Sequence, residues 1–287
     1  MKPFSLNLHG KVVEFDRPVV MAIVNATPDS FFSGSRTASA AEVERRVEML
    51  LAEGTDIIDL GACSTRPGSE SIDADEELRR LEMALEAVRR VSPTVPVSVD
   101  TFRASVARRC LTSLGADIIN DISGAADPDM MTAVAELRAP YVLTHMRGTP
   151  ATMQQLTDYS ADGGVTASVL AFMAGRISAM ADMGISDIMV DPGFGFAKTV
   201  EQNWELMGEL TAMTILDRPL LVGISRKSML TRPLDISPAD ALPATTAAHI
   251  IALQRGADIL RVHDVDAARQ AIGVWELSQN HTDCNHG

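Results

Sequence analysis

Short runs rich in Ile, Val and Leu alternate along the chain with longer segments of helical periodicity, about eight times. The runs predict strands at residues 19–25, 57–61, 95–100, 118–123, 141–145, 188–192, 220–225 and 259–263. Segments such as 40–54, 73–91 and 102–115 lie between them and show the spacing of helices. A strand that is apolar at successive positions is buried on both faces, as parallel strands between helices are. The pattern therefore predicts an α/β protein, a (β/α)8 TIM barrel.

The pattern continues without a Pro-, Gly- or Ser-rich linker, so we expect one domain, residues 1–287. Within it, residues 6–16 predict a short N-terminal β-hairpin, 19–279 the barrel and 280–287 a polar tail. The length of 287 residues suits a single barrel, which typically needs about 250.

One phrase recurs through the chain: a Gly, then an Asp, then an apolar run. A Gly there ends a helix, and the Asp opens the next strand. The repeat predicts that these aspartates cap loops at the stabilising, amino-terminal face of the barrel. They are Asp56, Asp117, Asp187 and Asp258.

Composition narrows the function classes. The formal net charge of −13 argues against nucleic acid and anionic membranes as partners, since both require a basic surface. No window approaches the roughly 18 to 20 uninterrupted apolar residues of a membrane span. Three widely spaced cysteines do not suggest a disulfide framework. We therefore expect a cytoplasmic protein.

Polar residues gather at the carboxyl ends of the predicted strands, which share one mouth in a closed barrel. This convergence predicts a small-molecule site, built from Asn25, Asp59, Asp100, Asn120, Asp121, His145, Asp191, Ser225, Arg226, Lys227, Arg261 and His263. The cations Arg66, Arg226, Lys227 and Arg261 favour an anionic ligand, with phosphate or pyrophosphate the leading candidate. The alternative is that these cations form structural salt bridges with Asp59, Asp100, Asp191 and Asp264.

Eight motifs, in order from about residue 20 to 275, carry a specific resemblance. They are NATPDSFF (25–32), STRPG (64–68), SVDT (98–101), NDISG (120–124), HMRGTP (145–150), DPGFGFAK (191–198), GISRKS (223–228) and RVHD (261–264). The chain resembles the dihydropteroate synthase family of pterin-binding enzymes. That resemblance implies a transferase of folate biosynthesis on a (β/α)8 barrel. It would condense 6-hydroxymethyl-7,8-dihydropterin pyrophosphate with p-aminobenzoate to 7,8-dihydropteroate and pyrophosphate, by an SN1-like path.

The resemblance also implies residue roles. The pterin would be bound by Asp100, Asn120, Asp191 and Lys227. Pyrophosphate and the cofactor Mg²⁺ would lie at Asn25, Thr65, Arg66, Arg261 and His263, with Asn25 as the metal ligand. The p-aminobenzoate pocket would comprise Phe31, Pro67, Phe196 and Ser228, and the catalytic set Asp100, Lys227, Arg261 and His263. A homodimer and competitive inhibition by sulfonamides are further implications.

Some positions depart from the family pattern. Ala62 and Cys63 replace the usual Gly and Glu, which would make Cys63 an oxidisable neighbour of the site. Arg147 stands where Gln is common, and residues 32–36 lack the expected acidic and glycine residues. Two alternatives stay open: a methyltetrahydrofolate:corrinoid methyltransferase type of barrel, and a catalytically silent pterin-binding paralogue. The pyrophosphate motifs favour the synthase over the first alternative.

Overall fold

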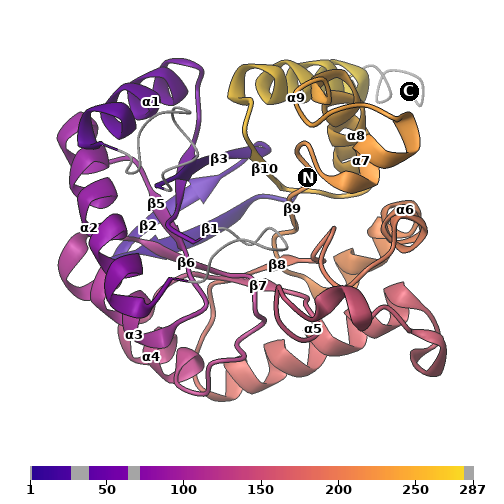
Figure 1. Ribbon diagram of the computed structural model, residues 1–287, viewed down its shortest axis with the longest axis horizontal. Coiled ribbons are helices and arrows are strands. Elements are labelled where there is room, and N and C mark those ends of the chain that lie inside the picture. Colours follow the sequence, from indigo (N-terminus) through magenta and orange to yellow (C-terminus); the bar gives the residue numbers. More distant parts are fainter. Residues whose placement is uncertain (1, 27–38, 64–71, 281–287) are drawn as a thin grey trace.

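The computed structural model describes residues 2–26, 39–63 and 72–280 and has the architecture of a (β/α)8 barrel (Figure 1). Eight parallel strands follow the order β8-β7-β6-β5-β4-β3-β10-β9. The first and last strands of this order meet through one bridge, between Val190 and Leu220. The strands are β3 Val19–Asn25, β4 Ile57–Gly61, β5 Val97–Asp100, β6 Ile118–Asp121, β7 Tyr141–Thr144, β8 Ile188–Asp191, β9 Leu221–Val222 and β10 Ile259–Val262.

All eight predicted strands are confirmed, and they differ from the predicted ranges mainly at their ends. The largest difference is at the predicted strand 220–225, of which only Leu221–Val222 pairs as β9. The chain leaves the sheet at Gly223, and Arg226 adopts a left-handed conformation with φ 58°. The polar end of this segment is thereby freed from the sheet and faces the barrel mouth.

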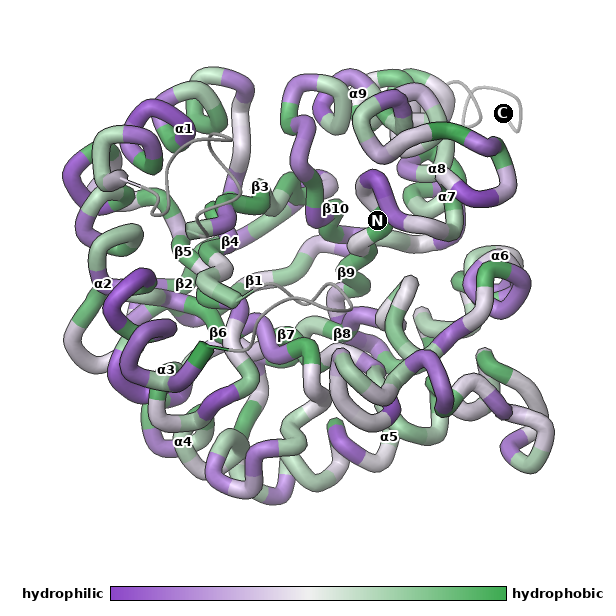
Figure 2. The backbone as a smooth tube through the Cα atoms, in the orientation of Figure 1, coloured by the Kyte–Doolittle hydropathy of each residue, from purple (hydrophilic) through white to green (hydrophobic). Residues whose placement is uncertain are grey.

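Helices surround the barrel, and each lies between two consecutive strands in the sequence or follows the last (Figure 1). Figure 2 shows hydrophilic and hydrophobic residues alternating around the turns of the outer helices, as expected when one face is buried. The helices are α1 Ala40–Ala52, α2 Ala74–Val91, α3 Ala104–Arg109 (extended by a π turn, Cys110–Leu114), α4 Met130–Leu137, α5 Val165–Asp182, α6 Val200–Gly208, α7 Ser228–Leu234, α8 Leu242–Gln254 and α9 Val265–Asn280. Short 3₁₀ segments lie at Met153–Gln155, Ser160–Asp162 and Leu210–Leu216.

Local sequence explains where helices begin. Ser39 and Glu42 form a capping box at α1, and Thr199 and Gln202 form one at α6. Each box satisfies backbone N–H groups that the first helical turn leaves without partners.

The N-terminal hairpin, β1 Phe4–Leu8 and β2 Lys11–Phe15, covers the amino-terminal end of the barrel. Leu6 and Leu8 pack into a cluster that lines the lower barrel interior. The other buried members of the cluster come from the strands: Val19, Met21, Ile57, Ile118, Val142, Met189, Leu221 and Ile259. The hairpin therefore closes this end of the barrel with apolar side chains, and any ligand must use the opposite end.

The four strand-opening aspartates behave as predicted. Asp56 accepts a hydrogen bond from Val20 N at 2.8 Å, and Asp117 accepts one from Val97 N at 2.8 Å. Asp187 and Asp258 likewise accept from Asn7 N and Leu220 N, at 2.7 and 2.9 Å. Each carboxylate satisfies a backbone N–H of a neighbouring strand, which identifies this end of the barrel as structural.

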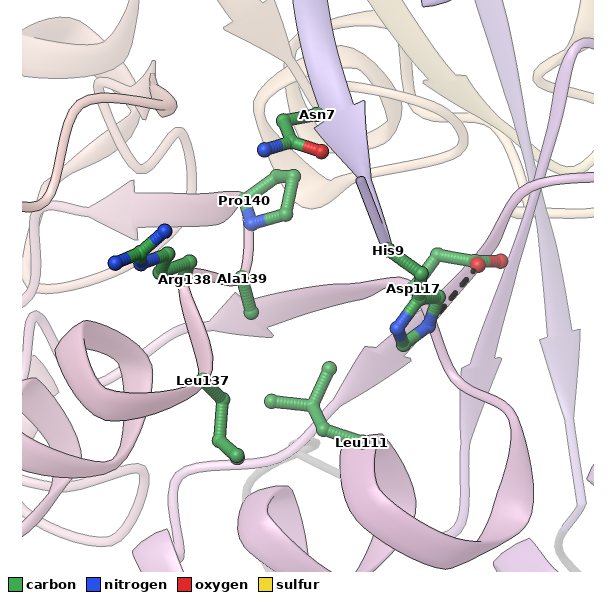
Figure 3. A pocket seen from close by; sticks show the side chains of 8 residues that line it. All are labelled: Asn7, His9, Leu111, Asp117, Leu137, Arg138, Ala139 and Pro140. Carbon is green, nitrogen blue, oxygen red and sulfur yellow. Dashed lines mark ion pairs between the residues drawn. The ribbon is translucent and has the colours of Figure 1, made fainter. Parts of the chain in front are cut away.

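A cavity of about 70 Å³ also opens at this structural end, between the hairpin turn and the starts of neighbouring strands (Figure 3). His9 lines it and lies 3.4 Å from Asp117, while its Nε2 contacts Ala116 O at 2.9 Å. The volume accommodates about two waters and is too small for a pterin. The cavity is therefore no candidate for the substrate site.

One helix of the described chain, α5, is long and apolar enough to span a membrane by length and composition. It is a barrel helix, and Val165, Val169, Met173 and Met180 are buried. The core helix of a soluble protein meets the same criterion, so this finding is weak evidence for a membrane.

Candidate active site

The upper half of the barrel interior is polar, although the lower half is apolar. Side chains two residues apart in a strand share a face. In four strands an apolar residue of the lower cluster is followed two positions later by a polar one: Ile57 by Asp59, Ile118 by Asn120, Met189 by Asp191 and Ile259 by Arg261. In each of these four strands the sequence pattern therefore places one apolar residue deep in the barrel and one polar residue above it.

Strand register aligns three of the predicted site residues in one row. Asn25 pairs with Gly61, Gly61 with Asp100, and Asp100 with Asn120. Gly61 is needed in this row because a Cβ there would lie 3.3 Å from Asn25 Oδ1 and 3.7 Å from Asp100 Cβ. The missing side chain leaves Asn25 and Asp100 room on either side of it.

Arg261 joins two carboxylates from distant parts of the sequence. Its Nε donates to Asp59 Oδ2 at 2.7 Å, and its Nη2 donates to Asp100 Oδ2 at 2.7 Å. Burial raises the pKa of Asp100 to about 7, against the opposing charge of Arg261. Arg261 thus favours the ionised form of a carboxylate that its buried position would otherwise neutralise.

Asp59 was predicted at the barrel mouth from the sequence, but without a contact to any particular part of the ligand. It is fully buried, and its Oδ2 also accepts from Asn120 Nδ2 at 3.1 Å. Within the described residues its Oδ1 has no hydrogen-bond partner. The available signal was an acidic residue inside the otherwise apolar run IIDLG.

Asp191 and Lys227 form the second charged part of the site. Asp191 is 5% exposed, and its Oδ1 accepts from Gly193 N at 2.8 Å. Lys227 Nζ donates to Phe194 O at 2.6 Å and lies 4.7 Å from the centre of the Phe196 ring. Burial raises the pKa of Asp191 and lowers that of Lys227 to about 8, and the opposite charge of each residue opposes the shift of the other.

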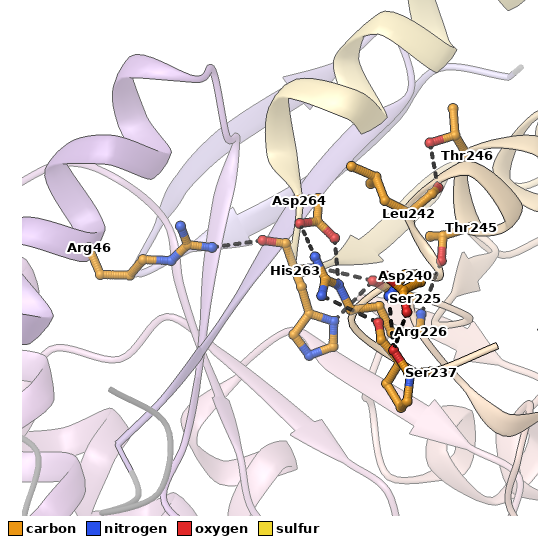
Figure 4. Close-up of polar contacts among 11 residues, drawn as sticks. Arg46, Ser225, Arg226, Ser237, Asp240, Leu242, Thr245, Thr246, His263 and Asp264 are labelled. Carbon is orange, nitrogen blue, oxygen red and sulfur yellow. Dashed lines mark hydrogen bonds and ion pairs between the residues drawn. The ribbon is translucent and has the colours of Figure 1, made fainter. Parts of the chain in front are cut away.

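Arg226 forms a structural salt bridge, which was the alternative to a ligand-binding role for the cations. Its Nη2 and Nε bond the carboxylate of Asp264 at 2.6 and 2.9 Å, and its backbone N donates to Thr245 Oγ1 at 3.1 Å (Figure 4). Arg261 also forms salt bridges, with Asp59 and Asp100. The two cations differ in place, because Arg261 lies inside the barrel and Arg226 joins the loops that precede α7 and α9.

His263 lies just past β10 and is held from two sides (Figure 4). Its Nδ1 lies 3.0 Å from Ser225 Oγ, and its carbonyl accepts from Arg46 Nη2 at 2.7 Å. Ser228 is the first residue of α7, immediately after Lys227. Both segments place their polar residues at the carboxyl end of the barrel.

Phe196 forms a small apolar wall with Met146, Met153 and Ala197. The two methionines were not among the predicted site residues, since a Met carries no distinctive sequence signal. The predicted residues Phe31, Thr65, Arg66 and Pro67, together with the unusual segment 32–36, lie outside the described residues.

Cys63 is half-buried at the end of β4, and Arg103 Nη1 lies 3.7 Å from its Sγ. Burial and the charge of Glu77 raise the pKa of the Cys63 thiol to about 11. The thiol therefore stays protonated at neutral pH, which argues against the predicted ready oxidation.

Comparisons with known proteins agree with one another. The pattern of the pterin binding enzyme family matches residues 21–263. A dihydropteroate synthase from Synechocystis sp. is 42% identical over 262 residues, which cover 90% of this chain and 89% of that protein. The Escherichia coli K12 dihydropteroate synthase is 37% identical over 280 residues, 97% of this chain and 96% of that protein.

Solved structures agree as well. A Yersinia pestis dihydropteroate synthase in a sulfonamide drug complex superposes with a TM-score of 0.89 at 34% identity, covering 96% of this chain and 100% of that one. A Xanthomonas albilineans dihydropteroate synthase with 4-aminobenzoic acid gives a TM-score of 0.86 at 40% identity, covering 96% and 98%. Since sequence and fold both match over nearly the whole chain, this protein belongs to the pterin-binding enzyme family, among its dihydropteroate synthases.

Proposed function

We propose that this chain condenses 6-hydroxymethyl-7,8-dihydropterin pyrophosphate with p-aminobenzoate to form 7,8-dihydropteroate and pyrophosphate. One observation carries the proposal: buried Asp191 and half-buried Lys227 share the polar end of the barrel with the Asp59–Asp100–Arg261 cluster, and the other end of the barrel is closed. Solved relatives contain 4-aminobenzoic acid in one case and 7,8-dihydropteroate in another, which supports one substrate and the product.

The pterin would lie between these two groups. Its edge carries an amino group and a ring N–H, and both can donate to one ionised carboxylate, a role that suits Asp191. Lys227 would donate to the pterin carbonyl and ring nitrogen. Asn120 can donate as well as accept, and Asp100 accepts. A buried charged group is stabilised by such partners, so the ligand would compensate for the burial of Asp191 and Lys227.

The pyrophosphate end would lie nearer Asn25, Arg261 and His263. The Asn25 amide oxygen suits Mg²⁺, a hard cation that takes oxygen ligands and usually keeps several waters and substrate phosphate oxygens. Among the described residues no group of three His, Cys, Asp or Glu side chains could enclose a metal. A single protein oxygen fits an ion whose other ligands are waters and substrate phosphate oxygens. When bound, Mg²⁺ would offset negative charge on the leaving group.

The reaction would follow an SN1-like path. The bond from the pterin methylene carbon to the pyrophosphate oxygen breaks, and its electron pair leaves with pyrophosphate. Arg261 and His263 would bind the charge that develops there. The ionised form of Asp100, which Arg261 favours, would stabilise the positive charge delocalised over the pterin. The neutral amine of p-aminobenzoate then forms the C–N bond and loses a proton, and the chain needs no covalent nucleophile.

The second substrate would lie against Phe196, whose ring offers an apolar surface, with Ser228 as a donor for the p-aminobenzoate carboxylate. Sulfonamides share the aniline ring of that substrate, and a solved relative carries such a drug. We therefore expect them to compete with p-aminobenzoate at this site.

Two further expectations concern the protein as a whole. An apolar groove of about 240 Å³ lies between α6, α7 and α8, lined by Trp204, Leu230, Pro233, Leu234, Ala244, Ala247, Ala248 and Ile251. Leu234 is 57% exposed on it. We propose that a second copy of the chain covers this groove in a homodimer, which analytical ultracentrifugation would detect, and that the enzyme is cytoplasmic.

The test of function is pyrophosphate release that requires both substrates and Mg²⁺, with 7,8-dihydropteroate identified by mass spectrometry. Pterin binding without pyrophosphate release would indicate the silent paralogue. Methyl transfer from methyltetrahydrofolate to a corrinoid, with no dihydropteroate formed, would indicate the methyltransferase.

A further inference from the structure

Lys198 is a buried cation to which the proposed mechanism assigns no role. It is 3% exposed, and its Nζ lies 2.9 Å from Gly193 O, 3.1 Å from Phe196 O and 3.0 Å from His145 Nδ1. An ammonium group has three donors and no acceptor. Each of its three protons therefore has one acceptor, and two of these acceptors belong to the loop between β8 and α6.

The first of these contacts leads to the proposed pterin carboxylate. Gly193 accepts from Lys198 through its carbonyl and donates through its N–H to Asp191 Oδ1 at 2.8 Å. Gly193 has φ +73°, and a Cβ on it would lie 2.0 Å from His145 O. The loop thus crosses the end of β7 in a conformation open only to glycine, and Lys198 holds it there.

The second contact leads to the proposed p-aminobenzoate wall. Lys198 binds the carbonyl of Phe196, while Lys227 binds the carbonyl of Phe194 and lies over the Phe196 ring. Two lysines therefore hold carbonyls of the same loop. Lys227 does so from the side of the barrel interior with one of its three donors, which leaves donors for substrate. Lys198 is enclosed and keeps its contacts.

The third contact, with His145, bears on the protonation of both side chains. Burial, together with the charge of Lys198, lowers the pKa of His145 to about 2, so the ring is neutral. While Lys198 is protonated and donates to Nδ1, a neutral ring carries its proton on Nε2. Burial lowers the pKa of Lys198 to about 7, and the charge of Asp191 opposes that shift.

We propose that Lys198 is a positioning residue for both substrates: through Gly193 and Phe196 it orients the Asp191 carboxylate toward the pterin and the Phe196 ring toward p-aminobenzoate. The inference rests on the proposed function. It assigns Lys198 no contact with either substrate, because its three donors are taken by the loop and by His145.

The test is steady-state kinetics of Lys198→Met, which keeps the length and burial of the side chain but has no donor. We expect KM for both substrates to rise about 10- to 100-fold, as the loss of hydrogen bonds from a charged group predicts, with a smaller fall in kcat. The matched control is Arg89→Met. Arg89 also makes three kinds of contact, with Gly115 O, Val95 O and Asp117, but at the structural end of the barrel.

Arg89→Met should lower the melting temperature and leave both KM values within about twofold, which separates positioning from general stability. A folded Lys198→Met enzyme whose KM values also stay within twofold would overturn the proposal. Lys198→Gln keeps two donors, so KM for both substrates should rise less than in Lys198→Met. KM values within twofold of the wild type in a folded Lys198→Gln enzyme would likewise count against the proposal. In the wild type, ¹⁵N NMR should find His145 protonated on Nε2, and a proton on Nδ1 would overturn the proposal even if neither variant folds. A wild-type enzyme that releases no pyrophosphate would instead refute the proposed function.

Discussion

Replacing Asp191 by Asn tests pterin recognition most directly, because the change keeps the shape of the side chain and removes its charge. The remaining carbonyl oxygen would still accept from Gly193 N, as Asp191 Oδ1 does at 2.8 Å. The new amino group would then face the donors of the pterin edge. Two charge-assisted hydrogen bonds would be lost, about 3–6 kcal/mol in total, which corresponds to roughly 10²- to 10⁴-fold in Kd.

Stability should change in the opposite direction. Burial raises the pKa of Asp191 above its ordinary value, so the folded state binds this proton more tightly than the unfolded chain does. Ionisation of Asp191 therefore costs stability as the pH rises through that pKa, and a neutral amide avoids the cost. We expect the melting temperature of Asp191→Asn at pH 7 to equal or exceed that of the wild type.

The assay is isothermal titration calorimetry with 7,8-dihydropteroate, paired with thermal unfolding. Asp258→Asn is the control, since Asp258 is a half-buried carboxylate whose pKa is also raised by burial but which caps Leu220 at the structural end. It should leave Kd unchanged. If Asp191→Asn bound 7,8-dihydropteroate within threefold of the wild type, the assignment of Asp191 to the pterin would be wrong.

Three other outcomes are expected. Gly61→Ala places a Cβ 3.3 Å from Asn25 Oδ1, so kcat/KM should fall about tenfold because Asn25 is displaced. The circular dichroism spectrum should stay the same, and unchanged kinetics would argue against Asn25 in the site. Asp117→Ala removes the acceptor of Val97 N, so urea denaturation should show the free energy of unfolding lowered by about 1–3 kcal/mol. We expect kcat/KM to be unaffected, and a loss of activity would contradict the structural role of that end of the barrel. The pKa of Lys227 is lowered to about 8, so kcat/KM for the pterin substrate should fall as the pH rises through about 8; Lys227→Arg, which stays protonated, should lack that fall.

The sequence by itself determined the barrel fold, and it predicted that the site lies at the carboxyl end of the strands. Apolar runs separated by helices predict parallel strands, and all eight are present. The steps from Ile57 to Asp59 and from Met189 to Asp191 already place one apolar and one polar residue on the same strand face. The repeated Gly–Asp phrase likewise separates capping aspartates from those at the mouth. Such features are local, because strand periodicity and capping depend on neighbouring residues alone.

Only the tertiary structure decided which of the polar residues meet. Arg226 and Lys227 are adjacent in the sequence, yet the left-handed turn at Arg226 directs one to Asp264 and the other to Phe194 O. Arg261 binds Asp59 and Asp100, which lie 202 and 161 residues away. Lys198 gave no sign in the sequence that it would hold the loop of Asp191. These contacts depend on strand register and on barrel closure, which bring distant segments together, and no pattern of nearby residues encodes them.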